Sequence, residues 1–200
     1  MTITECSFTI DLVIALRTKD LDKQQRIKEA LVQLILREGM QGASISKIAR
    51  EARVSPATIY VYYESKDEML SDVFQEYARQ SYRYLMRRVR PDMDGAQFID
   101  ALVRGYYAYS VEHEEVFSFV EQCSRCPTLS DTVDQRACCC EILDLIHQYQ
   151  DRGQVRRYSD VSLAAVLFSP VRSLAMKQGG ADRDVQLAEL VQMLQDTLLI

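Results

Sequence analysis

Apolar residues along this chain recur three and four positions apart, which is the spacing of amphipathic α-helices. Gly39, Gly153 and the pair Gly179-Gly180 follow helical stretches, at the position where glycine commonly ends a helix. The spacing predicts about nine helices, over residues 20–37, 45–52, 56–62, 66–89, 95–111, 114–122, 129–151, 160–178 and 183–199. No stretch shows the alternation of a half-buried strand, so the predicted fold class is all-α.

Residues that favour helix starts support this assignment. Pro56 occupies the first position of a predicted helix, where its missing N–H is not needed. Ser65 with Glu68, and Asp94 with Gln97, have the three-residue spacing of a capping box. N-cap residues precede four of the predicted helices, namely Ser44, Ser55, Ser65 and Asp94.

Composition and charge are typical of a soluble helical protein with two unlike halves. The 200 residues are 48% apolar and 26% charged, and 7 Gly and 4 Pro are too few for a many-turned β protein. The net charge is −5, but residues 17–90 carry 15 Lys and Arg against 10 Asp and Glu, whereas residues 91–200 carry 9 against 17. A basic N-terminal half beside an acidic remainder indicates a nucleic-acid-facing module, with chance segregation of charge as the alternative.

Residues 45–62 have the plan of a helix-turn-helix. A short helix, the turn Arg53-Val54 and a second short helix follow a longer helix, an arrangement that places the second helix in the DNA major groove. Six short sequence features occur here in order: an Ile-Ala pair, Val-Ser, Ile-Tyr, an aromatic pair, Ser-Lys and Leu. The run from Ser46 to Leu70, SKIAREARVSPATIYVYYESKDEML, resembles the DNA-binding domain of the tetracycline-repressor (TetR) family. The resemblance covers residues 19–77; beyond residue 80 only the number and length of helices agree.

Two positions depart from the family pattern. Arg53 stands in the turn where family members usually have Gly, and a positive φ there would cost Arg about 1 kcal/mol. A contact from Arg53 to a DNA phosphate would compensate for that strain. Ala57 stands where Gly is frequent, and its small side chain keeps a close approach to DNA possible.

The helix-turn-helix offers nine candidate DNA contacts. Ser44 and Ser46 lie at a helix N-terminus, whose free N–H groups attract phosphate. The resemblance implies that Lys66 touches the DNA backbone and that Tyr60 and Tyr62 mainly contact phosphates. The candidates are Ser44, Ser46, Arg53, Ser55, Ala57, Thr58, Tyr60, Tyr62 and Lys66.

The predicted recognition helix, 56–62, lacks Arg, Lys, Asn and Gln, so the strong bidentate base contacts are unavailable from it. Readout is expected to depend on Ser and Thr hydroxyls, thymine methyl contacts and DNA shape. Core packing is the alternative role for Tyr60 and Tyr62, whereas Tyr63 is expected to pack inward. Lys47 and Arg50 either face DNA or belong to a solvated helix face.

By the same resemblance, residues 66–200 bind a small molecule and dimerise, after an arm at 1–16 and a DNA-binding domain at 17–65. Aromatic and Met side chains with few polar groups suit a small hydrophobic or aromatic ligand, with ordinary core packing as the alternative. The candidate ligand-binding residues are Tyr82, Met86, Tyr106, Tyr107, Tyr109, Phe117, Phe119 and Met176. The apolar helices 160–178 and 183–199 are expected to form a four-helix homodimer interface, or else pack only within the chain.

Residues 1–16 contain a short apolar stretch that Asp11 interrupts and that no Lys or Arg precedes, unlike a signal peptide. They form a frayed arm, dock on the body of the protein, or extend the chain upstream of the module. No apolar run approaches the roughly 20 residues of a membrane-spanning helix. The expected location is therefore cytoplasmic, with no membrane partner.

The six cysteines permit a thiol- or metal-sensing alternative, but His spacing around them is irregular and no metal site is expected. His113 and His147 are expected to be surface or structural residues. No Ser/His/Asp set or Gly-rich phosphate loop is present, so neither an enzyme nor a cofactor is expected. The sensing alternative would use Cys123, Cys126 and Cys138, Cys139 and Cys140.

The leading hypothesis is a ligand-responsive DNA-binding transcriptional regulator. A dimeric repressor would bind a palindromic double-stranded DNA operator, and a small-molecule effector would favour a conformation whose recognition helices no longer match the groove spacing. The family resemblance implies that the fourth helix transmits the change. A DNA-binding adaptor without a ligand is the remaining alternative.

Overall fold

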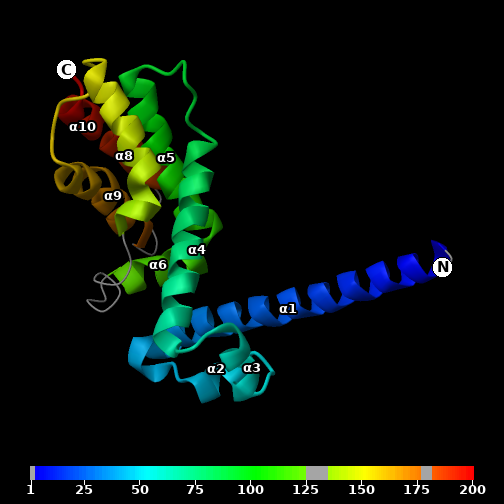
Figure 1. The fold of residues 1–200 in the computed structure, drawn as a ribbon. Helices are drawn as coiled ribbons and strands as arrows, with labels where there is room; N and C mark the ends of the chain where they lie inside the picture. Colours follow the sequence, from blue (N-terminus) through cyan, green and yellow to red (C-terminus); the bar gives the residue numbers. More distant parts are fainter. Residues whose placement is uncertain (1–2, 125–134, 177–181) are drawn as a thin grey trace. The chain divides into compact units, whose positions relative to one another are not determined.

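The computed structural model describes residues 3–124, 135–176 and 182–200, with side chains described in 20–124, 142–176 and 182–200. Within these ranges the fold is all-α, as predicted, and the only β feature is an isolated bridge between Val155 and Leu199. Nine helices are described: α1 Ile3–Gly42, α2 Ile45–Glu51, α3 Pro56–Tyr62, α4 Lys66–Met86, α5 Gly95–Glu112, α6 Glu114–Ser124, α8 Gln135–Asp151, α9 Asp160–Met176 and α10 Arg183–Leu198 (Figure 1).

Two predicted helix ends were wrong. The backbone of α1 is helical from Ile3 rather than from Asp20, because residues 3–19 contain neither Gly nor Pro to interrupt it. Gly39 does break the helix, with φ 75° and ψ 173°, before a last turn to Gly42. Helix α4 ends at Met86 rather than Val89, where the hydrogen bond from the Arg88 amide to the Leu85 carbonyl tightens the final turn. Residues 129–134, 177–178 and Gly179-Gly180 lie outside the described residues.

The chain divides into two compact units, Met1–Phe74 and Gln75–Ile200. Their boundary falls within α4, so this helix contributes to both units, whereas the sequence predicted a boundary between residues 65 and 66. No helix in the described ranges is long and apolar enough to cross a membrane.

The N-terminal unit is a small helical domain whose core comes from α1, α2, α3 and the first part of α4. Helix α2 packs against both α1 and α3, which fixes the short helices on the longer one. Tyr63 is 4% exposed and packs inward, as predicted. The fully buried apolar side chains include Ile27, Leu31, Ile35, Ile48, Ile59, Met69 and Val73.

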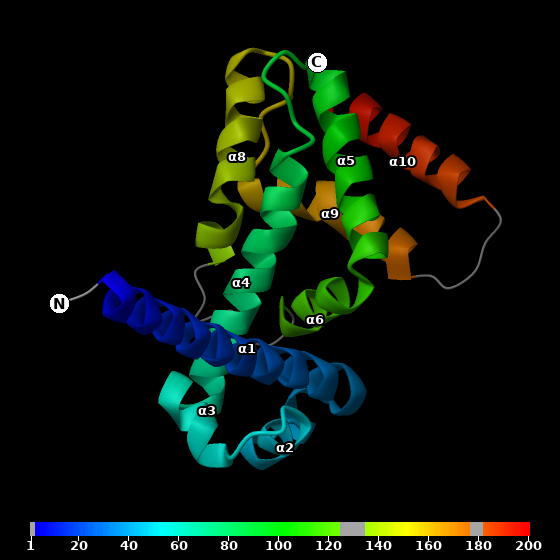
Figure 2. The same cartoon turned by 90° about the vertical axis from the view of Figure 1, so that its right-hand side faces the viewer.

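The C-terminal unit is built around α5, which packs against α6, α9 and α10 (Figure 2). Phe98 of α5 stacks on Tyr149 of α8, with ring centroids 4.1 Å apart, and the Tyr149 hydroxyl donates to the Met93 carbonyl at 3.0 Å. The end of α10 is tied to the segment after α8, where the Arg156 amide donates to the Leu198 carbonyl at 2.7 Å. These contacts enclose one continuous apolar core.

Candidate nucleic-acid interface and a cavity in the C-terminal unit

The two short helices begin where the sequence predicted. The Ser44 Oγ accepts a hydrogen bond from the Lys47 amide at 3.4 Å and caps α2. The Ser55 Oγ accepts from the Thr58 amide at 3.2 Å and caps α3, with Pro56 in the first helical position. Each cap satisfies an N–H that the helix itself leaves without a partner.

The turn between α2 and α3 requires the left-handed conformation. Arg53 has φ 56° and is the only non-glycine residue with positive φ in the described part of the chain. The turn closes through hydrogen bonds from the Arg53 amide to the Arg50 carbonyl and from the Val54 amide to the Ala49 carbonyl. An arginine here bears a strain of about 1 kcal/mol that glycine would avoid.

Helix α3 presents small hydroxyl and apolar groups on its outer face. Ser55, Ala57 and Tyr60 are exposed, while Thr58 is half-buried with its hydroxyl 2.9 Å from that of Ser55. Val61 is 77% exposed and was missed by sequence reasoning, although its position four residues after Ala57 places it on the same face. This face can offer hydroxyls, methyl groups and one phenol, but neither an amide nor a cation.

Tyr62 and Lys66 bond to α1 in the structure. The Tyr62 hydroxyl donates to the carboxylate of Asp20, and that hydrogen bond raises the pKa of Tyr62 to about 12. Lys66 Nζ donates to the Met40 carbonyl at 2.7 Å, near the end of α1. Both side chains are half-buried, so their contacts with DNA stay predictions.

Ion pairs distinguish the basic residues around α2. Lys47 Nζ lies 2.5 Å from Glu38 Oε2, and this hydrogen bond is the main reason that the pKa of Glu38 is lowered. Arg50 and Arg53 are exposed and form no hydrogen bond or ion pair through their side chains with any described residue. These two guanidinium groups are therefore available to an external anion, whereas Lys47 is engaged. Ser46, also exposed, lies in the first turn of α2.

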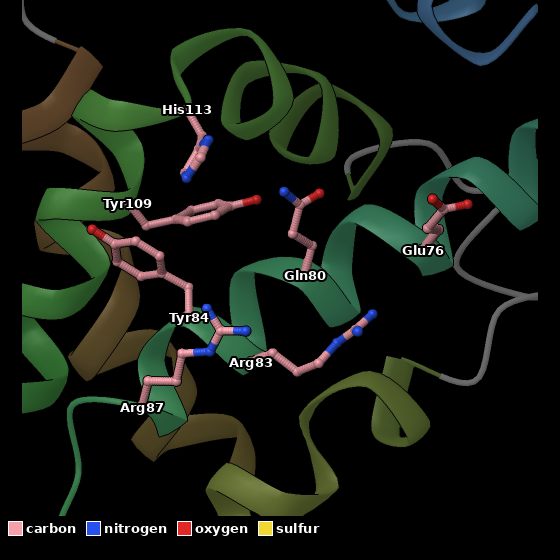
Figure 3. Close-up of a pocket in the computed structure, with 7 residues that line it drawn as sticks. All are labelled: Glu76, Gln80, Arg83, Tyr84, Arg87, Tyr109 and His113. Carbon is pink, nitrogen blue, oxygen red and sulfur yellow. The ribbon is translucent and has the colours of Figure 1, made fainter. Parts of the chain in front are cut away.

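A cavity of about 420 Å³ opens in the C-terminal unit (Figure 3). Of the eight candidate ligand-binding residues, Tyr109 lines it and the other seven do not. Sequence reasoning missed the lining residues on and just after α4, whose signal was a polar row at positions 76, 80, 83, 84 and 87 that follows helical spacing. The cavity is lined by Glu76, Gln80, Arg83, Tyr84, Arg87, Tyr109 and His113.

Several other candidates pack within the core. Tyr106 contacts the rings of Phe117 and Phe168, with centroids 5.4 and 5.0 Å away, and its hydroxyl donates to Glu121 at 3.2 Å. Burial, and next the charge of Glu121, raise the pKa of Tyr106. Phe119 and Tyr82 are buried, Met86 and Tyr107 are half-buried against the core, and Met176 is 53% exposed.

Within its described residues the structure gives no support to a thiol or metal site. Cys123 is buried in α6, while Cys126 and the side chains of Cys138, Cys139 and Cys140 lie outside the described residues. Among the residues that can be described, no group of three or more His, Cys, Asp or Glu side chains could hold a metal ion.

Comparisons with known proteins agree with this architecture. Residues 27–73 match the model of the bacterial regulatory proteins of the tetR family. A helix-turn-helix transcriptional regulator of Haemophilus influenzae is 25% identical over 175 residues, covering 86% of this chain and 91% of that protein. The nicotine-responsive repressor HdnoR of Paenarthrobacter nicotinovorans is 31% identical over 87 residues, 44% of this chain and 43% of the repressor.

Solved structures show the same fold. A TetR-family regulator from Marinobacter aquaeolei VT8 superposes with a TM-score of 0.77 at 21% identity, over 92% of this chain and 98% of that one. The fold, the capped helix-turn-helix and these relatives define a DNA-binding transcriptional regulator rather than an enzyme. The N-terminal unit contains a helix-turn-helix domain that matches the tetR family over residues 27–73.

Proposed function

We propose that this protein is a homodimeric repressor that binds a palindromic operator and releases it when a small molecule binds the C-terminal unit. The observation that carries the proposal is the outer face of α3, which presents hydroxyl and methyl groups, together with two available guanidinium groups, one at the end of α2 and one in the turn before α3. In this account Ser55, Ala57 and Thr58 read base edges in the major groove. Arg50 and Arg53 bind the flanking phosphates.

The proposed dimer interface comprises residues 160–178 and 183–199. One face of α9 is exposed along its whole described length and carries only small or apolar side chains: Ser162, Val166, Ser169, Ser173 and Met176. These positions repeat every three or four residues, as in helices that pack against a partner helix. Val185 and Met193 are exposed on α10 and offer further apolar side chains to a second copy.

Helix α4 supports a link between ligand binding and DNA release, because it contributes residues to both compact units. A ligand changes DNA affinity only if it binds the released conformation more tightly than the bound one. One relative, HdnoR, is a nicotine-responsive repressor, which supports a small-molecule response as the general mode. We keep the functional bounds expected from the sequence, in which residues 17–65 bind DNA and residues 66–200 bind the ligand and dimerise.

Analytical ultracentrifugation with a DNA duplex from beside the protein's own gene tests this proposal. We expect wild type to sediment as a dimer and to bind one dimer per palindrome. Val166→Glu should dissociate the dimer and weaken operator binding at least about tenfold, because a half-site alone loses the second set of contacts. Val111→Glu places the same charge on an exposed valine of α5 and should change neither property.

A monomeric wild type, or a Val166→Glu dimer that binds the operator normally, would contradict the proposed interface. Circular dichroism of both variants confirms that the glutamate leaves the helical fold intact.

A further inference from the structure

We propose that the cavity between α4 and α5 binds an organic anion, with an acidic group such as a carboxylate attached to a flat apolar body. The inference rests on the proposed ligand response and assigns a chemical class to the ligand. It adds an acidic group to the sequence-based expectation of a small hydrophobic or aromatic ligand, because Tyr109 is the one lining residue that the sequence suggested and the lining also includes two arginines.

Two guanidinium groups supply the attraction for an anion. Arg83 and Arg87 line the cavity four residues apart, on one face of the helical turn closed by the Arg87 amide and the Arg83 carbonyl. Neither side chain forms an ion pair with a carboxylate in the described part of the chain. The neighbouring Arg88 differs, since it lies 3.9 Å from Glu112 and 2.6 Å from the Tyr84 hydroxyl.

Three rings form a wall suited to a flat body. The ring of Tyr109 lies 5.1 Å from that of Tyr84 and 4.8 Å from that of His113, measured between centroids. Figure 3 shows the Tyr109 ring between the other two, with the side chains of Gln80, Arg83 and Arg87 coming from the α4 side. Aromatic surface with cations beside it is complementary to a molecule with one apolar and one acidic part.

Tyr109 contributes a buried polar group beside this cavity. Its side chain is 1% exposed, and its hydroxyl makes no hydrogen bond with any described residue. Burial raises the pKa of Tyr109 to about 12, so the hydroxyl stays protonated and is a donor at neutral pH. A buried donor without an acceptor is unfavourable, and a carboxylate oxygen entering the cavity would satisfy it.

Glu76 determines which end of the cavity the acidic group occupies. It lies seven residues before Arg83 along α4, so the helix presents one carboxylate at one end and two cations at the other. An acidic group is repelled at the Glu76 end and attracted at the Arg83 and Arg87 end. The lining groups include two guanidinium groups against one carboxylate, a balance of charge that favours an anion over a neutral molecule of the same shape.

Two probes of the same shape test the inference, naphthalene-2-carboxylate and its neutral amide, naphthalene-2-carboxamide. Titration calorimetry with full-length wild type should give a Kd for the carboxylate at least about tenfold below that for the amide, which corresponds to about 1.4 kcal/mol. In the Arg83→Gln, Arg87→Gln variant the two Kd values should agree within about twofold. Tyr109→Phe should weaken carboxylate binding more than amide binding.

Arg79→Gln is the matched control, because Arg79 lies on α4, bonds Gln75 at 2.8 Å and does not line the cavity. This variant should keep the carboxylate preference. Any of three results would overturn the inference: equal Kd values of the two probes for wild type, no binding of either probe, or a carboxylate preference that survives the double substitution. Operator binding without a carboxylate preference overturns this inference alone, whereas a carboxylate preference without operator binding overturns the proposed function alone.

Discussion

The hydroxyl of Tyr62 on α3 donates a hydrogen bond to the carboxylate of Asp20 on α1, 42 residues earlier in the chain. The contact fixes the end of the recognition helix to the first helix of the same unit. It also places a carboxylate beside a residue that the family resemblance assigns to phosphate binding. The Asp20 carboxylate and a DNA phosphate would therefore compete for the same hydroxyl.

Replacing Tyr62 by Phe removes this hydrogen bond and should lower the free energy of unfolding by about 0.5–1 kcal/mol at pH 8. Because the folded-state pKa of Tyr62 is raised to about 12, its stabilising effect is complete below the unfolded pKa of about 10 and is lost as pH rises through 12. Urea unfolding at pH 8 and pH 11.5 should show a smaller difference between wild type and variant at the higher pH. Tyr60→Phe, at an exposed position, should change stability at neither pH.

Replacing Arg53 by Gly should have opposite effects on folding and on DNA binding. The positive φ at this turn is free of strain for glycine, so the free energy of unfolding should rise by up to about 1 kcal/mol. Operator affinity should fall, and the slope of log affinity against log salt should decrease by about 1, because one phosphate contact is lost. Thermal unfolding and a salt series measure the two effects; unchanged operator affinity would show that Arg53 does not contact DNA.

Two substitutions of Ser55 distinguish its role as the N-cap of α3 from its proposed contact with DNA. Ser55→Ala removes the acceptor for the Thr58 amide and should cost about 1 kcal/mol of stability. Ser55→Asp restores an N-cap and should keep stability close to wild type. Its negative charge at the DNA face should nevertheless reduce operator affinity more than Ser55→Ala does. An Asp variant that binds the operator as tightly as wild type would exclude Ser55 from the interface.

The pair of Arg172 with Glu121 should be important for folding of the C-terminal unit. Arg172 Nε lies 2.7 Å from Glu121 Oε2, and Glu121 is only 5% exposed at the side chain. Arg172→Met leaves this carboxylate buried without a cation and should cost about 2–4 kcal/mol, since only donors such as Tyr106 remain. Arg157→Met breaks an exposed pair with Asp151 and should cost less than about 0.5 kcal/mol. Equal costs for the two variants in denaturant unfolding would contradict this assignment.

Local signals in the sequence predicted much of the fold. Ser44, Ser55 and the pair Asp94 and Gln97 cap the helices that they precede, because an N-cap bond depends only on residues within one turn. The left-handed turn at Arg53 followed from comparison with a family pattern that has glycine there. These features depend on neighbours in the chain rather than on tertiary contacts.

The parts that the sequence did not reveal depend on distant partners. The bonds of Tyr62 to Asp20 and of Lys66 to Met40 join residues 42 and 26 positions apart, so no local pattern encodes them. Core and cavity residues also share the same apolar spacing, and Tyr106 and Tyr109 could not be told apart until the packing was seen. Nothing in the sequence singled out Arg83 and Arg87, because charge alone does not indicate that a cavity lies beside a helix.

The most direct test of DNA recognition by α3 is fluorescence anisotropy with a labelled duplex from beside the protein's own gene, measured across a salt series. We predict tight, site-specific binding by wild type, with log affinity falling steeply and linearly as log salt rises. The Thr58→Ala, Tyr60→Ala variant should lose at least about tenfold in affinity for this site and less in its weak affinity for unrelated DNA. Selection on genomic fragments with ligand-free wild type first supplies the best duplex. Equal affinity of wild type and variant for that duplex would contradict the account.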